Sequence, residues 1–109
     1  MRDRRLKRIN QLIKEKVADI LSKDSFSSDC LITVKDVETS NDMKRARIMI
    51  SVIPFSKSED ILKILNKKAS FIQRELNKEV EFKFTPRIGF EIDKGEEKAE
   101  RINRILKEM

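Results

Sequence analysis

The sequence predicts a helix-rich α+β fold in a single domain, residues 1–109. Only two Gly and two Pro occur in the whole chain, which favours long regular elements over disorder or a turn-rich all-β architecture. Apolar residues recur with helical and strand periodicities in the order α-β-β-α-β-α. A chain of this length buries somewhat over ~60% of the surface that its unfolded form exposes, which is enough for one core. We therefore expect a three-stranded sheet covered on one face by helices.

The first half of the chain predicts a helix followed by a β-hairpin. Residues 4–22 place apolar side chains on one helical face: Leu6, Ile9, Ile13, Val17, Ile20 and Leu21. After a polar connection, a strand is expected from Leu31 to Val37 or Glu38, and a second strand from Arg47 to Ile53. Residues 39–44 are short enough to join the two strands as a hairpin.

A long helix is expected next, from about residue 58 to residue 78. Ser56 precedes Glu59 by three residues, which is the pattern of a capping box at a helix start. The apolar face that follows holds Ile61, Leu62, Leu65, Ala69, Ile72 and Leu76.

The last part of the chain predicts a strand and a closing helix. Val80, Phe82 and Phe84 alternate with charged residues, Pro86 bends or interrupts the strand, and residues 88–92 continue it. Asp93 and Glu96 then repeat the capping pattern. The apolar face of the closing helix holds Ala99, Ile102 and Ile105 or Leu106.

The residue inventory argues against an enzyme. The absence of His removes the commonest general base, the usual metal ligand and every Ser-His or Cys-His pair. Cys30 is the single cysteine, so we expect a buried structural role for it and a reducing compartment. Gly89 and Gly95 are the only glycines, so no phosphate-binding glycine motif exists. We expect no catalysis, no cofactor and no small-molecule substrate.

Acidic residues near the end of the chain have two interpretations. Glu91, Asp93, Glu96 and Glu97 suggest a hard-cation site, but carboxylates at a helix N-terminus also stabilise the helix dipole. We favour capping and expect no metal.

The charge distribution favours a polyanionic partner. The chain carries 25 Lys and Arg against 19 Asp and Glu, a net charge of +6, although a solvated, heat-adapted surface has a similar composition. From Glu91 onward six acids face five bases, so the excess positive charge lies earlier. The clusters there are Arg2, Arg4, Arg5, Lys7 and Arg8; Lys44, Arg45 and Arg47; and Lys63, Lys67, Lys68 and Arg74.

Membrane binding is another explanation for the positive charge, because the first helix is basic and amphipathic. That helix has no aromatic anchor, and the core needs its apolar face. No apolar run approaches the roughly 20 residues that span a bilayer, and no signal peptide precedes the helix. We expect a cytoplasmic protein with no membrane contact.

Four segments, in their order and spacing, resemble one known family. They are Arg4–Leu21, then Val34–Met43 followed by Ala46, Ile48, Ser51 and Val52, then Phe71–Leu76, and finally Pro86–Asp93. Together they resemble the ribosome-binding factor A family, bacterial factors for maturation of the small ribosomal subunit. The resemblance implies a KH-like fold of the type II order, with a kinked helix pair in place of the GXXG loop. At the kink, where the family carries Ala-x-Gly, this chain reads Lys68-Ala69-Ser70; a Ser hydroxyl suits a kink because it can bond the backbone.

The resemblance also implies a partner and a set of contacts. The partner is 16S rRNA in free 30S subunits during late processing, near the 5′ end and the decoding region, with a role in growth in the cold. The candidate RNA-binding residues are Arg4, Arg5, Lys7, Arg8, Arg45, Lys67, Lys68, Ser70, Arg74 and Arg87. With no Trp or Tyr, we expect little base stacking, so that affinity comes chiefly from phosphates and shape. We also expect a monomer. The alternative is a non-ribosomal module that docks an acidic protein or self-associates.

Overall fold

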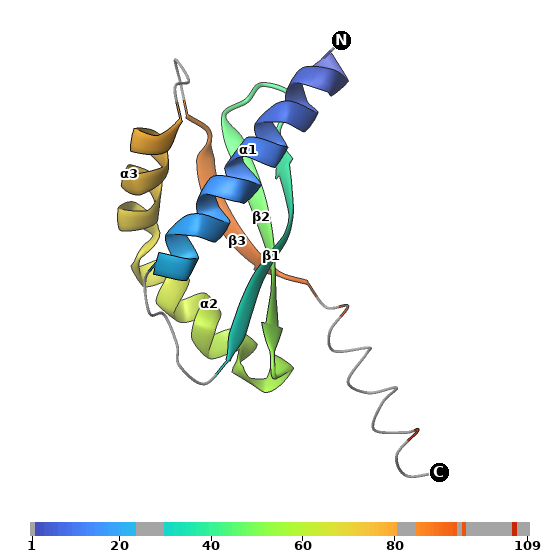
Figure 1. Cartoon of the computed structure of the whole chain (residues 1–109), viewed down its shortest axis with the longest axis vertical. Helices are drawn as coiled ribbons and strands as arrows, with labels where there is room; N and C mark the ends of the chain where they lie inside the picture. Colours follow the sequence, from blue (N-terminus) through green and yellow to red (C-terminus); the bar gives the residue numbers. More distant parts are fainter. Residues whose placement is uncertain (1, 24–29, 81–84, 94, 96–105, 107–109) are drawn as a thin grey trace.

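A three-stranded sheet backed by three helices makes up the computed structural model, which describes residues 2–23, 30–80, 85–93, 95 and 106 (Figure 1). The elements follow one another as α1 (Arg2–Lys23), β1 (Leu31–Thr39), β2 (Arg45–Ile53), a 3₁₀ turn (Phe55–Lys57), α2 (Ser58–Lys67), α3 (Ala69–Glu79) and β3 (Arg87–Ile92). The predicted first helix and β-hairpin are confirmed, each extended by a few residues.

The central strand of the sheet is β2. It pairs antiparallel with β1, from Leu31 opposite Ile53 to Thr39 opposite Ala46. On its other side it pairs parallel with β3, because α2 and α3 return the chain to the end of the sheet where β2 began. The strand order is therefore β1-β2-β3.

A β-bulge brings the buried side chains of β1 to one face. Val34 and Val37 are three residues apart, so a regular strand would point them to opposite faces. The register between β1 and β2 shifts between Val34 and Asp36, which leaves Lys35 as the extra residue. Val34 at 6% exposure and Val37 at 2% consequently both join the core.

The core lies between this face of the sheet and the helices (Figure 1). α1 packs on β1 and against α3, while α2 packs on β2 and β3. The largest fully buried side chains are Ile13, Ile48, Ile50, Leu65, Ile72 and Leu76. The opposite face of the sheet is not covered by any of the described helices, and its exposed residues include Thr33, Arg45, Arg47 and Glu91.

The single long helix predicted from residue 58 to 78 is wrong in one respect, since it is two helices. Lys68, with φ −97° and ψ 9°, leaves the helical conformation between α2 and α3. The kink that the family resemblance implied is therefore present, although no Gly or Pro stands there.

The predicted capping box is also wrong. Lys57 is the residue before α2, and no side chain caps that helix. Ser56 lies inside the preceding 3₁₀ turn, where the Lys57 N–H donates to the Pro54 carbonyl at 3.0 Å. The helix begins on a turn that is already hydrogen-bonded, so a Ser side chain is not needed there.

Two predictions fall partly on residues outside those described. The strand segment with Phe82 and Phe84 lies outside them, while Val80 is buried and extended before it. Of the closing helix only Asp93, Gly95 and Leu106 are described, and Asp93 Oδ1 accepts the Gly95 N–H at 2.9 Å. No helix in the described part of the chain is long and apolar enough to cross a membrane.

Candidate nucleic-acid interface

The structure sorts the predicted RNA-binding residues into three exposed groups. One group lies at the beginning of α1: Arg4, Arg5, Lys7 and Arg8. A second surrounds the kink between α2 and α3: Lys67, Lys68, Ser70 and Arg74. The third consists of Arg45 and Arg87, at the first residues of β2 and β3. We call these the α1 group, the kink group and the strand pair.

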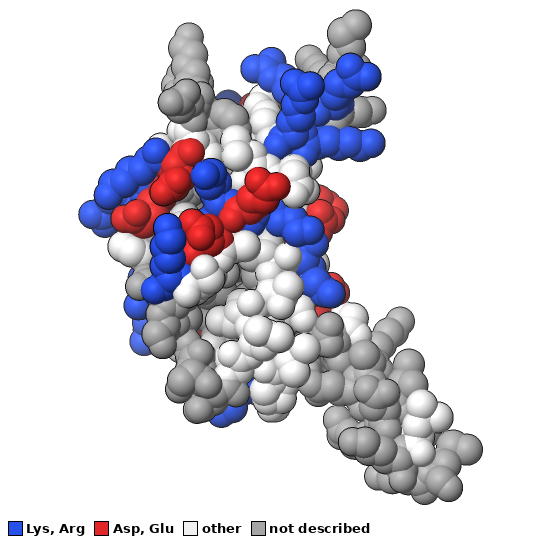
Figure 2. Space-filling view, viewed as in Figure 1, with Lys and Arg blue, Asp and Glu red and all other residues white. Residues whose placement is uncertain are grey.

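The α1 group is held in place by a polar contact between α1 and the sheet. Asn10 Oδ1 accepts the backbone N–H of Thr39 at 2.9 Å and its hydroxyl at 2.6 Å. Thr39 is buried, so these hydrogen bonds fix the middle of α1 against the end of β1. The residues before Asn10 project beyond that point, and Figure 2 shows their Lys and Arg side chains gathered at this end of the molecule. None of the four cations forms an ion pair with a described residue.

The kink group surrounds a change of helix direction at which the backbone of Lys68 still forms hydrogen bonds on both sides. The Lys68 N–H donates to the Ile64 carbonyl at 3.1 Å, and the Lys68 carbonyl accepts the Ile72 N–H at 3.0 Å. Ser70 and Arg74, four residues apart on α3, share a helix face. The surface at the kink is therefore cationic, and backbone hydrogen bonds join the two helices there.

Sequence reasoning missed one residue at the kink. The Phe71 side chain is 39% exposed, between Ser70 and the buried Ile72. Phe71 does not share the buried helix face of Ile72 and Leu76. The only sign in the sequence that it could be a surface residue was the position of an aromatic residue beside that apolar face. An exposed ring among cations is a surface on which an RNA base can stack.

The α1 group and the kink group do not form one continuous surface. Figure 1 shows the first turn of α1 at one end of the molecule, and the α2–α3 junction near the other end of α1. The 22 residues of α1 span about 33 Å at a rise of ~1.5 Å per residue. A ligand that touches both groups must therefore be large.

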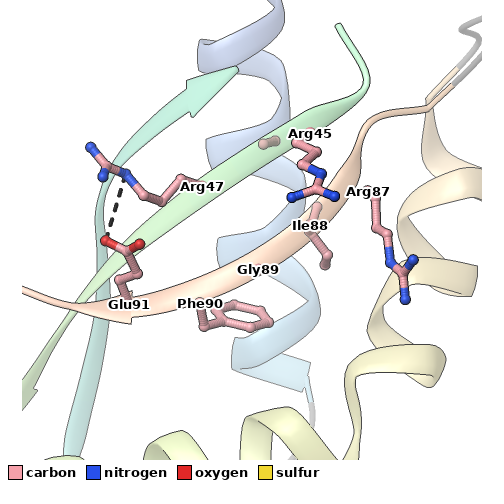
Figure 3. Close-up of a pocket in the computed structure, with 8 residues that line it drawn as sticks. Arg45, Arg47, Arg87, Ile88, Gly89, Phe90 and Glu91 are labelled. Carbon is pink, nitrogen blue, oxygen red and sulfur yellow. Dashed lines mark ion pairs between the residues drawn. The ribbon is translucent and has the colours of Figure 1, made fainter. Parts of the chain in front are cut away.

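The strand pair lies on the open face of the sheet, away from the helices. Arg45 and Arg87 are direct neighbours in the parallel ladder, and the Arg87 N–H donates to the Lys44 carbonyl at 2.9 Å. A side chain of α3 fixes the start of β3, because Gln73 Nε2 donates to the Pro86 carbonyl at 3.1 Å and Gln73 Oε1 accepts the Ile88 N–H at 2.9 Å. An open hollow of about 490 Å³ lies beside the pair (Figure 3).

Acidic residues near the strand pair have structural roles. Glu38 and Glu91 both pair with Arg47, at 2.6 Å and 3.6 Å. Asp42 accepts the Ser40 hydroxyl at 2.6 Å and the Lys44 N–H at 3.0 Å, and these two hydrogen bonds, the hydroxyl first, lower the pKa of its carboxyl. These contacts shape the hairpin turn, in which Met43 takes a positive φ of 60°.

The acidic and thiol side chains of the described residues do not form a metal site. The described residues contain no group of three or more Cys, Asp and Glu side chains that would hold a metal ion. Cys30, for which a buried structural role was predicted, is only half-buried, and it packs against the core.

Two features define an α+β protein with a KH-like fold: the element order, and the parallel pairing of β2 with β3, which are connected by two helices that meet at a kink. The family model of ribosome-binding factor A matches residues 5–106. The chain therefore belongs to the ribosome-binding factor A family.

Curated relatives agree with this membership, and two solved structures are similar in fold. The ribosome-binding factor A of Thermodesulfovibrio yellowstonii is 36% identical over 97% of this chain and 91% of its own length. That of Clostridium novyi is 32% identical over 94% of this chain and 87% of its own. The crystal structure of ribosome-binding factor A from Thermus thermophilus has a TM-score of 0.69 at 20% identity, covering 80% of this chain and 94% of that one. A solution structure from Thermotoga maritima has a TM-score of 0.56 at 27% identity, covering 83% and 84%.

Proposed function

We propose that this protein binds the small ribosomal subunit and assists late maturation of 16S rRNA, near the 5′ end and the decoding region. It acts without catalysis, as a cytoplasmic monomer that recognises RNA by its phosphates and shape. The observation that carries the proposal is the family match over residues 5–106. The exposed cations of the α1 group and the kink group support RNA as the partner.

The separation of the two groups suggests how binding changes the rRNA. A ligand shifts a conformational equilibrium only if it binds one state more tightly than the other. Two cationic surfaces near opposite ends of α1, a helix about 33 Å long, contact phosphates at a fixed spacing. Only an rRNA arrangement with that spacing gains both sets of contacts, so binding stabilises that arrangement over others.

Co-sedimentation with purified small subunits, large subunits and intact ribosomes tests the proposal. The informative variants are K67A/K68A/R74A in the kink group and R4A/R5A/R8A in the α1 group. A matched control is K16A/K23A/K78A, which removes the same formal charge from lysines already paired with acids, at 3.5, 3.1 and 3.4 Å. Surface pairs of this kind contribute little to stability, so the control should fold.

We expect selective binding to small subunits that each test variant weakens and the control does not. Selective binding that the kink variant leaves intact would keep the ribosome as the target but move the contact to α1. Equal binding to large and small subunits at every salt concentration would refute the proposal and favour the protein-docking alternative.

A further inference from the structure

The open face of the sheet carries a hollow that the two helix surfaces do not use. It is lined by side chains of β2 and β3 around Gly89: Arg45, Arg47, Arg87 and Glu91. Its volume of about 490 Å³ lies within the ~300–1,000 Å³ range of small-ligand sites. Figure 3 shows β3 without a side chain at Gly89, between the strand pair and the Arg47–Glu91 ion pair.

Charge at one end of the hollow is not neutralised by the described residues. Arg45 and Arg87 occupy opposed positions on neighbouring strands, where like charges are destabilising. Neither forms an ion pair with any residue that the structure describes, whereas Arg47, two positions along β2, is held by Glu38 and Glu91. A bound anion between Arg45 and Arg87 would relieve this repulsion.

Gly89 is a second, independent observation. A Cβ built at this position meets nothing within 4 Å, and no glycine among the described residues has a positive φ. Neither crowding nor backbone conformation therefore requires glycine, and glycine inside a strand lowers stability. Its effect is to leave a flat strip of bare backbone, open to solvent, beside the two arginines.

We propose that this hollow binds one nucleotide of single-stranded RNA. The phosphate lies between Arg45 and Arg87, and the base lies flat over Gly89. Arg47 lies at the end of the base away from the phosphate, where two carboxylates hold its planar guanidinium in place. A base inside a duplex is stacked on its neighbours and cannot lie on the sheet, so the site selects single strands. The inference rests on the proposed RNA-binding function but places a contact on the face of the sheet opposite the helices.

The test measures binding of a fluorescent oligouridylate of about ten nucleotides, a length within known single-strand site sizes. Gly89→Val fills the hollow without changing charge, and its control, Thr33→Val, places the same side chain on the same face of the sheet, outside the hollow. R45Q/R87Q removes the proposed phosphate contacts, and K23Q/K78Q removes equal charge from two ion-paired lysines. Thermal unfolding of every variant is measured alongside, and a duplex RNA of equal length is the second ligand.

We expect Gly89→Val to weaken oligouridylate binding about tenfold, as loss of one base contact does, while leaving duplex binding and folding intact. R45Q/R87Q should weaken oligouridylate binding more than K23Q/K78Q, and Thr33→Val should match the wild type. Wild-type binding by Gly89→Val, an equal loss with Thr33→Val, or no oligouridylate binding by the wild type would each overturn the inference.

Co-sedimentation with small subunits keeps this result separate from the proposed function. A wild type that binds small subunits while Gly89→Val leaves oligouridylate binding unchanged refutes only the nucleotide site. A wild type that shows no small-subunit selectivity refutes the proposed function, whatever the oligonucleotide result.

Discussion

Phe71 exposes an aromatic side chain that would add more to the stability of the fold if it were buried. It leaves 39% of its surface in solvent beside the kink, while its neighbour Ile72 is fully buried. Lys67, Lys68 and Arg74 lie on the same part of the molecule. An aromatic ring in that setting can stack on a base that the lysines and arginine bring close, which would add to the phosphate contacts expected from the sequence.

Replacing Phe71 by Leu should therefore weaken small-subunit binding by about 1 kcal/mol, roughly fivefold. Leu keeps the helix propensity and most of the buried apolar contact but removes the flat ring. Phe71→Tyr keeps the ring and should bind like the wild type. Dissociation constants from sedimentation of the three proteins decide the matter. If Leu and Tyr behaved alike, the ring would have no role in binding.

Asp42 links a single carboxyl to the hairpin turn and makes a prediction about pH. Hydrogen bonds from the Ser40 hydroxyl and the Lys44 N–H lower the pKa of its carboxyl in the folded state. A lowered folded pKa contributes stability that is present above the unfolded pKa and is lost as pH falls through the folded one.

Asp42→Asn keeps the hydrogen-bond acceptor but does not titrate. The wild type should be the more stable of the two at neutral pH, and the difference should shrink as pH falls below about 4. Urea unfolding of both proteins at a series of pH values measures this difference. A gap that stays constant into strong acid would show that the turn does not depend on the ionised carboxyl.

At the scale of whole elements, periodicity was a good guide to α1 and the β-hairpin but not to the kink. Leu65, Ala69, Ile72 and Leu76 follow one another at spacings of four, three and four, so the apolar pattern runs through Lys68 without interruption. What differs is tertiary, because α2 packs on β2 and β3 while α3 packs on α1 and β3. A single straight helix could not pack on β2 and β3 with its first half and also on α1 with its second half.

The candidate site, like the fold, was predictable from the sequence only in part. Each cation was identifiable from composition and resemblance, and their exposure follows from their charge. The pairing of Arg45 with Arg87 was not predictable, because it depends on the parallel register of two strands far apart in sequence. The hollow over Gly89 depends on that register as well.

Gln73 couples α3 to β3 and should behave as part of both elements. Its amide donates to the Pro86 carbonyl and accepts the Ile88 N–H. Gln73 therefore provides hydrogen bonds at the edge of β3 that does not pair with β2. Replacement by Ala leaves both backbone groups without this partner and should cost about 1–3 kcal/mol of unfolding free energy.

The control for Gln73→Ala is Asn77→Ala on the same helix. Asn77 is exposed, and the only described hydrogen bond of its side chain is the one that Oδ1 accepts from Gln73 Nε2 at 3.2 Å, so its loss should cost much less. Urea denaturation of both variants measures the difference. Hydrogen exchange at Ile88 should also accelerate selectively in Gln73→Ala, and equal losses from the two variants would contradict the bridging role.

For the whole molecule, the arrangement of charge matters more than the net value of +6. The α1 group and the kink group place exposed cations at both ends of α1, while the Lys16, Lys23 and Lys78 side chains pair with acids. Figure 2 shows positive side chains gathered at the start of α1, and mixed charges over the α3 side. The three paired lysines add to the net charge but have acids beside them, so we expect them to contribute little to phosphate binding.

This arrangement predicts how binding responds to salt. Each phosphate contact contributes about 0.7 to 0.9 to the slope of log affinity against log salt concentration, so R4A/R5A/R8A and K67A/K68A/R74A should each flatten the slope for small subunits. If the α1 group and the kink group hold separate rRNA segments at once, the two reductions should add when the variants are combined, as they do for distant, independent sites. Sedimentation across a salt series measures all three slopes, with K16A/K23A/K78A as the charge-matched reference. If the slope of the combined variant were no flatter than the flatter of the two single-variant slopes, the two groups would bind one RNA segment in turn. The proposed recognition of phosphates at a fixed spacing would then be wrong.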